Sequence, residues 1–290
     1  MNSIVNLKIY YHYIEMYNDN FNKPLKPFFC RVGAKNKTLG VIGELVPQNY
    51  KTYVEPFVGG GSVFLSLPQT EKEIINDKDK KLIAAWILLK CAVVDINKYD
   101  FPFTEDEYEK ERENSHLYRR YRNQVLVDKI QKFVDKKHTK PQNKLLSYLY
   151  QSCNSFSAKG GKIYKQYPQF NRIGKVNDYK TRLQNTTILN KDYKEVINQY
   201  DSEDTFFFLD PPYEKSDGLY TSDSINYDEM NDILCNIKGK FMLTLNDSGE
   251  IRDIFKLFNI INIKVKGRSH TSRRQMGGGI RDELIITNYK

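Results

Sequence analysis

The chain has 290 residues, enough for one large α/β domain or for a core domain with a sizeable insertion. Its net charge of +9 and pI near 9.1 favour a polyanionic partner. No apolar run reaches membrane-spanning length, nothing at the N-terminus resembles a signal peptide, and the four cysteines form no CxxC pair. These features argue against a membrane protein, a zinc site and a disulfide framework. We expect a soluble, intracellular protein in a reducing compartment.

The N-terminal region is predicted to begin with an amphipathic packing helix. One face of that helix would carry Ile4, Leu7, Tyr11 and Ile14. A glycine turn ending at Lys35 follows, and a helix is predicted from about Thr38 to Leu45. A lysine beside a glycine turn at a helix start can hold a carboxylate or a phosphate, although an ordinary surface turn gives the same pattern.

Residues 52–67 predict a strand, a glycine turn and the start of a helix. Gly59 and Gly61 let the backbone approach a ligand closely, and Ser62 can cap the following helix. Phe64 stands where a dinucleotide motif has its third glycine, and no Walker lysine is present. A dinucleotide fold and an NTPase are therefore disfavoured. Glu55, just before the turn, would repel a pyrophosphate but attract a cationic ligand.

A second strand is predicted at 73–76, ending at Asp77, with a helix through Trp86 to Lys90 after it. In nucleotide-binding α/β folds, a carboxylate at the end of the second strand binds ribose hydroxyls. The alternative is that Asp77 caps the helix N-terminus, and the two roles are compatible.

The middle of the chain changes in character. Residues 95–150 predict a helical insertion, with apolar residues at helical spacing from Val125 to Phe133. Residues 150–182 carry seven basic side chains against one acidic side chain, Asp178, interleaved with aromatic residues. Such a mixture suits phosphate contacts combined with stacking on bases. A solvated basic loop is the alternative.

Residues 206–213 give the strongest local signal. The apolar run 206–209 predicts a strand buried on both faces, with Asp210 at its carboxyl end, where open α/β sheets bind ligands. Pro211 and Pro212 lack N–H donors and hold the backbone extended. A carboxylate, the Pro211 carbonyl and the Tyr213 ring held together can bind a planar amine. The alternative is a strand that ends in a Pro-Pro turn.

The α/β alternation continues on both sides of this strand. The predicted segments are a strand at 187–189, a lid at 214–226, a helix at 227–237, a strand at 240–245, a helix at 249–257, a strand at 259–266, a basic glycine-rich loop at 267–279 and a last strand at 283–287.

Together these motifs resemble the Dam-like (D12 class) DNA adenine-N6 methyltransferases in their α arrangement. The resemblance rests, in chain order, on residues 32–35, 55–64, 76–77, 190–193, 210–213 and 283–288. It implies an α/β fold: a Rossmann-like methyltransferase sheet, mostly parallel with the last strand antiparallel, and an inserted, mainly helical target-recognition domain. The implied catalytic domain comprises 1–94 and 179–290, with the DNA-binding insertion at 95–178. Two positions depart from the family pattern, where Ala34 replaces a glycine and Arg31 an aromatic residue.

The resemblance also implies S-adenosyl-L-methionine (AdoMet) as methyl donor, double-stranded DNA as partner, no metal ion, and a monomer or weak dimer. Lys35 would hold the cofactor carboxylate, Asp77 the ribose, and Asp192 with Tyr193 the adenine end. The full implied cofactor set is Arg31, Lys35, Glu55, Phe57, Gly59, Gly61, Ser62, Asp77, Asp192, Tyr193 and Asp210.

By the same resemblance, Asp210, Pro211, Pro212 and Tyr213 are catalytic. Asp210 and the Pro211 carbonyl would accept hydrogen bonds from the amine of a flipped-out adenine on which Tyr213 stacks. The predicted DNA contacts are Lys159, Arg172, Asn154, Arg268 and Arg273, and the target suggested by relatives is GATC.

Two other functions stay open at this point. One is N6-adenine methylation of RNA, and the other is a catalytically silent DNA-binding subunit. Asparagine is more frequent than aspartate at position 210 in RNA enzymes, and an intact Asp-Pro-Pro-Tyr argues against loss of catalysis.

Overall fold

The computed structural model describes residues 24–114, 123–155, 161–212, 225–266 and 280–290. Several predicted features lie outside these residues. They are the N-terminal helix, most of the 214–226 lid, the basic loop at 267–279, and the site residues Tyr213, Lys159, Arg268 and Arg273.

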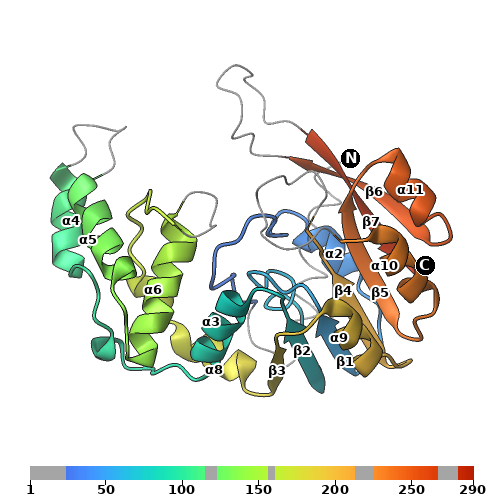
Figure 1. Cartoon of the computed structure of the whole chain (residues 1–290), viewed down its shortest axis with the longest axis horizontal. Helices are drawn as coiled ribbons and strands as arrows, with labels where there is room; N and C mark the ends of the chain where they lie inside the picture. The colour runs from blue at the N-terminus through green and yellow to red at the C-terminus, as the bar shows by residue number, and fades with distance from the viewer. Residues whose placement is uncertain (1–23, 115–122, 156–160, 213–224, 267–279) are drawn as a thin grey trace.

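Within the described residues, the strands form one seven-stranded sheet with the order β3-β2-β1-β4-β5-β7-β6 (Figure 1). The strands are β1 (Thr52–Glu55), β2 (Lys72–Asn76), β3 (Thr186–Leu189), β4 (Thr205–Leu209), β5 (Lys240–Asn246), β6 (Asn259–Lys266) and β7 (Ile280–Thr287). Strands β1 to β5 pair in parallel, whereas β7 runs antiparallel to both β5 and β6. The predicted mostly parallel sheet with an antiparallel last strand is confirmed.

Strand β4 shows why the sheet is covered on both sides. Phe206 and Phe208 point into one core and Phe207 and Leu209 into the other, since side chains alternate along a strand. All residues of β4 are buried. The predicted strand with two buried faces is thus the centre of a three-layer α/β/α arrangement.

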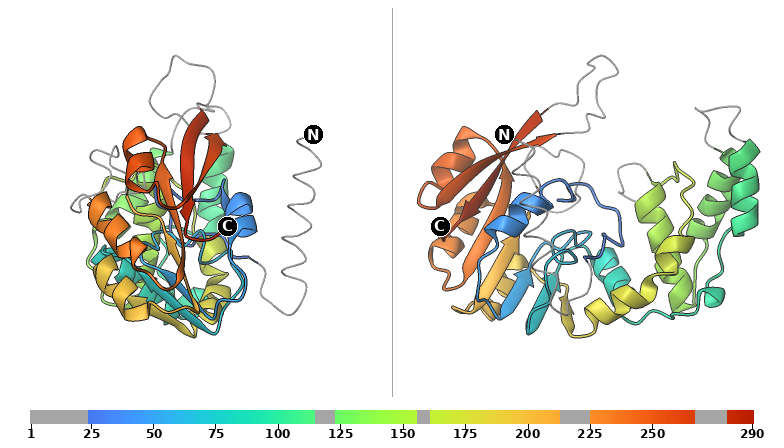
Figure 2. Two further views of the ribbon diagram at one scale, coloured as in Figure 1. Left: turned by 90° about the vertical axis from the view of Figure 1, so that its right-hand side faces the viewer. Right: turned by 180° about the vertical axis from the view of Figure 1, so that it is seen from behind.

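Helices from different parts of the chain supply the two outer layers (Figures 1 and 2). The first core includes side chains of α2 (Leu39–Leu45), α3 (Lys80–Lys90) and α8 (Val176–Leu183). It continues beside the sheet into α5 (Gln124–Asp135), α6 (Pro141–Asn154) and α7 (Phe170–Ile173). The second core includes side chains of α9 (Tyr193–Tyr200), α10 (Tyr227–Cys235) and α11 (Gly249–Ile254). The strand-helix alternation predicted for the C-terminal part is confirmed.

In the stretch of chain that connects α3 to β3, several helices form a region that lies to one side of the sheet (Figure 1). It contains the short 3₁₀ helix η1 (Ile96–Lys98), α4 (Glu105–Asn114), α5, α6 and α7. Helix α3 packs against α6 and α8 and so joins this region to the sheet. The predicted domain boundary at residue 178 falls inside α8, and the division into domains stays a prediction.

One local expectation differs from the structure. Residues 62–67, predicted to start a helix, make turns in which Leu65 N–H donates to Gly61 O and Leu67 N–H to Val63 O, and no continuous helix forms there. Side chains of this segment are instead buried in the first core, and the Phe64 side chain is completely buried. Elsewhere, each helix that the structure describes is too short or too polar to span a bilayer.

Candidate functional site

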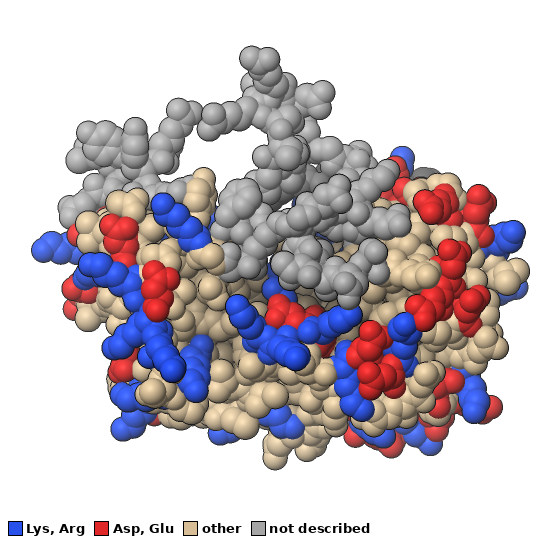
Figure 3. All heavy atoms as spheres, in the orientation of Figure 1, with Lys and Arg blue, Asp and Glu red and all other residues tan. Residues whose placement is uncertain are grey.

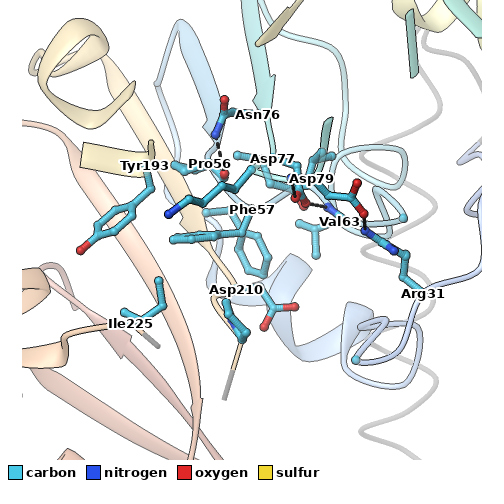
Figure 4. A pocket seen from close by; sticks show the side chains of 18 of the residues that line it. Arg31, Pro56, Phe57, Val63, Asn76, Asp77, Asp79, Tyr193, Asp210 and Ile225 are labelled. Carbon is cyan, nitrogen blue, oxygen red and sulfur yellow. Dashed lines mark hydrogen bonds and ion pairs between the residues drawn. The ribbon is translucent and has the colours of Figure 1, made fainter. Parts of the chain in front are cut away.

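A cavity of about 910 Å³ opens at the carboxyl ends of β1, β2 and β4. Strands β2 and β3 extend the sheet to one side of β1 and β4 extends it to the other, so the chain order reverses at this point. Open α/β sheets bind ligands at such a reversal. The walls come from side chains and backbone within the segments 31–35, 55–63, 76–81, 191–194, 208–212 and 225–229, although not every residue of these segments lines the cavity (Figure 4).

All the predicted cofactor residues except Gly61 line this cavity. The catalytic motif is divided: Asp210 and Pro212 line the cavity, Pro211 is buried outside its lining, and Tyr213 lies outside the described residues. The fold therefore brings most of the predicted site residues to one cavity, although these residues come from five separate segments of the chain.

The glycine turn serves two different purposes. Gly59 has φ +48° and open space at the Cβ position, and its N–H donates to Asp77 Oδ2 at 3.0 Å. Gly61 has φ +71°, and a Cβ there would lie 2.8 Å from the Trp86 ring. Glycine at 61 is therefore required for packing against Trp86, a reason that the sequence interpretation did not give.

Asp77 fastens the turn to the start of α3. Its Oδ1 accepts the Asp79 N–H at 2.9 Å while Oδ2 accepts the Gly59 N–H. Burial raises the pKa of Asp77, and the two backbone hydrogen bonds and Arg31 oppose that rise. The helix cap is Asp79, which accepts from Lys81 N–H and also pairs with Arg31. The alternative role considered for Asp77 thus belongs to its neighbour two residues on.

Asn76 is a positioning residue that the sequence interpretation did not single out. Its side-chain amide donates to Pro56 O at 2.9 Å and to Lys191 O at 3.0 Å, and its Oδ1 accepts the Lys191 N–H at 2.8 Å. It is almost fully buried. A polar amide directly after two buried isoleucines at the end of β2 was the available signal, because a buried amide must find hydrogen-bond partners.

Two aromatic rings form one wall of the cavity. The Phe57 and Tyr193 rings are 5.3 Å apart between centroids and tilted by 35° (Figure 4). Asp192 caps α9 by accepting the Lys194 N–H at 3.1 Å. A flat apolar wall with a carboxylate at its edge suits a purine ring and its polar substituents.

Asp210 is held by Lys35 and Thr244 at the end of β4. Lys35 Nζ lies 2.8 Å from Asp210 Oδ1, and the Thr244 hydroxyl donates to the same oxygen at 2.8 Å. Lys35 is 5% exposed, so this ion pair is largely shielded from water. The lysine predicted for the cofactor therefore also contacts the predicted catalytic carboxylate. Pro212 O accepts the Tyr227 hydroxyl at 3.1 Å, which fixes the chain after Asp210.

Glu55 lies deeper in the same site. Its Oε2 accepts the Tyr53 hydroxyl at 2.7 Å and the Phe64 N–H at 3.0 Å. Burial raises the pKa of Glu55 to about 8, and the charge of Asp210 adds to the rise. Ser62 is buried on the cavity wall.

Asn154 and Arg172, the predicted DNA contacts that the structure describes, do not line the cavity. Asn154 has no exposed surface, and its Oδ1 accepts the Tyr167 N–H at 2.7 Å, so its side chain is not available to DNA in this structure. The Arg172 guanidinium donates hydrogen bonds to the backbone carbonyls of Pro27 and Phe28. This gives Arg172 a structural role in holding the segment before the cavity wall.

Residues 32–268 match the model of the D12 class N6 adenine-specific DNA methyltransferases. The chain belongs to this family. Two relatives of the chain are described as type II methyltransferases. M1.LlaDCHI of Lactococcus lactis subsp. cremoris is 27% identical, with 91% of this chain and 96% of the relative aligned. M.CviBI of Paramecium bursaria Chlorella virus NC1A is 24% identical, with 91% of this chain and 100% of the relative aligned.

The solved structures give weaker likenesses to this D12 class chain. A putative methyltransferase, yhhF, from Escherichia coli superposes with a TM-score of 0.38 at 9% identity, covering 92% of each chain. As for metal ions, the described residues contain no group of three or more His, Cys, Asp or Glu side chains placed to hold one.

Proposed function

We propose that this D12 class methyltransferase transfers a methyl group from AdoMet to the N6 amine of an adenine in double-stranded DNA. The observation that carries the proposal is the position of Asp210, which lines the same cavity as Glu55, Phe57 and Asp77. A carboxylate for the target amine is thus beside a pocket with acidic and aromatic walls.

The residues present fit AdoMet. Asp210, paired with Lys35, provides a carboxylate at the end of the cavity beside β1 and β4, and Glu55 would ionise there when the sulfonium or the α-amino group of the cofactor binds beside it. Asp77, at the end of β2, suits the ribose hydroxyls, and the Phe57–Tyr193 wall suits the adenine. The cavity volume of about 910 Å³ is within the range of small-molecule sites.

Lys35 is proposed to act between two carboxylates. It lies 2.8 Å from Asp210, and an ammonium group with three donors can bind a second carboxylate at the same time. The same side chain would then hold the cofactor carboxylate and orient Asp210. Thr244 supports that orientation from β5.

AdoMet supplies an activated methyl group when bound. The Asp210 carboxylate and the Pro211 carbonyl accept hydrogen bonds from the adenine N6 amine and direct its lone pair toward the methyl group. Tyr213 stacks on the base, which leaves the duplex at a cost of a few kcal/mol. After transfer the methylated nitrogen gives up one proton to water, and the protein contributes mainly orientation and electrostatics.

Transfer of tritium-labelled methyl groups tests the proposal directly. Wild-type protein with labelled AdoMet should yield N6-methyladenine in unmethylated duplex DNA, with GATC as the first sequence to examine. Asp210→Ala should abolish transfer while Asp253→Ala, an exposed carboxylate on α11, should not. Transfer to RNA but not DNA would favour an RNA enzyme. No transfer to either, or an active Asp210→Ala variant, would overturn the mechanism.

A further inference from the structure

Two of the four cysteines meet between the cavity wall and the helical region. The Cys30 and Cys153 sulfurs are 2.9 Å apart although the residues are 123 positions apart in the chain. Cys30 precedes Arg31, which lines the cavity, and Cys153 is in the last turn of α6. The methyl-transfer chemistry uses neither thiol.

A basic group lies directly beside this pair. Arg172 Nη2 is 3.7 Å from the Cys30 sulfur, and the same guanidinium is fixed by the Pro27 and Phe28 carbonyls. The hydrogen bond with Cys153, together with Arg172 and Lys165, lowers the pKa of Cys30 to about 6 against the opposing effect of burial. The hydrogen bond with Cys30 and burial raise the pKa of Cys153.

The two cysteines also differ in access. Cys30 is half-buried and Cys153 is buried, so an oxidant from solvent reaches Cys30 first. A thiolate that is partly accessible, with a second thiol in contact, is the arrangement found in reversibly oxidised cysteine pairs.

We propose that Cys30 and Cys153 form a reversible oxidation site, in which Cys30 is the peroxide-reactive thiol and Cys153 the resolving thiol. The Cys30 thiolate sulfur attacks one oxygen of hydrogen peroxide, the O–O bond breaks, and Cys30 becomes a sulfenic acid. The hydroxide that leaves takes up the proton that Cys30 released on ionising and becomes water. The Cys153 sulfur then attacks the Cys30 sulfur, and the S–O bond breaks. A disulfide forms, and the departing hydroxide takes the Cys153 proton as water. Both sulfurs are oxidised, and the peroxide is reduced to two molecules of water.

This bridge has a defined structural consequence. It joins the chain immediately before the cavity wall at 31–35 to α6 of the helical region, across a long loop of sequence. Closing a long loop restrains the unfolded chain, so the oxidised protein should have a higher melting temperature than the reduced protein by several degrees.

Peptide mapping tests the site in the intact protein. The reduced protein is treated with hydrogen peroxide, blocked with iodoacetamide and digested without reductant. The expected product is a peptide pair joined through Cys30 and Cys153, with a mass lower by two hydrogens, which dithiothreitol separates. Unlinked Cys30 and Cys153, or bridges only through the exposed Cys91 and Cys235, would overturn the proposal.

Variants separate the roles of the groups. Cys91→Ser with Cys235→Ser leaves the Cys30–Cys153 pair intact and should still form the bridge. Cys153→Ser should stop at the sulfenic acid, which dimedone captures on Cys30. Arg172→Met should slow alkylation of Cys30 at pH 7 severalfold, and unchanged alkylation would refute the proposed activation. Because these readouts are masses and alkylation rates, they stand apart from the result of the methyl-transfer assay.

Discussion

Glu55 is a single buried side chain whose protonation makes the charge of the cavity depend on pH. Its carboxyl group is at the end of β1, accepts two hydrogen bonds on one oxygen, and has a pKa raised to about 8 by burial and by Asp210. The protonated form is thus favoured in the folded protein over much of the neutral range. A cationic ligand beside it would favour the ionised form.

Replacement of Glu55 should therefore change the pH dependence of stability. In the unfolded chain a glutamate ionises near the model value of 4.5, but in the folded chain it ionises near 8. Between these values the folded state binds the extra proton, so the free energy of unfolding falls as pH rises from 5 to 8. Glu55→Gln keeps one oxygen for both donors and should remove this fall.

Urea denaturation of both proteins from pH 5 to 9 measures the effect. The free energy of unfolding of wild type minus that of Glu55→Gln should decrease with rising pH by at most about 1.4 kcal/mol per unit and level off above 8. A pH-independent difference would show that Glu55 ionises normally in the folded protein.

The glycine turn and α3 illustrate what an element requires of its neighbours. Gly61 must be glycine for two reasons, a positive φ and the Trp86 ring beside it, whereas Gly59 has only the first. Trp86 in turn donates its indole N–H to Gly59 O at 3.1 Å. The turn and the helix therefore fix each other, and the Asp77 carboxylate is held between them.

Alanine substitutions should separate these effects. Gly61→Ala should lower the free energy of unfolding by roughly 3 kcal/mol or more, since strain and a steric clash add. Gly59→Ala should cost about 1 kcal/mol, the strain alone. Gly249→Ala at the start of α11, with open space and no positive φ, should be nearly neutral. Thermal and urea denaturation give the ranking, and equal costs at 59 and 61 would contradict the packing role of Gly61.

Helix α8 is attached to the sheet through a buried charge pair. The Arg182 guanidinium pairs with Glu73 on β2, donates to Phe64 O at 2.9 Å and lies 4.2 Å from the Phe64 ring centroid. Both charged side chains are almost fully buried. The helix that returns the chain from the helical region to β3 is thereby tied to the segment after the glycine turn.

Loss of Arg182 alone should be costly because it leaves Glu73 buried without its cation. Arg182→Met should lower the free energy of unfolding by roughly 3–5 kcal/mol. Adding Glu73→Gln should restore part of it, since no unpaired charge remains. Lys175→Met, an exposed position just before α8, serves as the control and should change little. A double variant less stable than Arg182→Met would refute this explanation.

At the scale of the whole molecule, the periodic and motif-bearing parts of the sheet were predictable from sequence. The apolar run of β4 and the carboxylates at the carboxyl ends of β1, β2 and β4 each have a local signal in the sequence, and the parallel sheet brings these carboxylates to one cavity. Contacts between segments that are distant in the chain had no local signal in the sequence. Arg172 looks like a DNA-binding residue in sequence, but the carbonyls that hold it come from residues about 145 positions earlier. The Lys35–Asp210 and Cys30–Cys153 pairs are equally non-local.

Charge is the property of the whole chain that bears on its substrate. The net charge is +9, and the space-filling view shows Lys and Arg side chains both over the helical region and around the centre of one face (Figure 3). Binding of a nucleic acid to such a surface releases counterions from the phosphates. Affinity for duplex DNA should therefore fall at least tenfold between 50 and 200 mM salt.

AdoMet binding provides the internal comparison for that prediction. The cofactor carries few charges, and the proposed pocket is partly buried, so its affinity should change little over the same salt range. Fluorescence anisotropy with labelled duplex and calorimetry with AdoMet measure the two affinities on one preparation. If the DNA affinity proves as insensitive to salt as the AdoMet affinity, the basic surface does not contact phosphates. The DNA would then have to be held by other contacts.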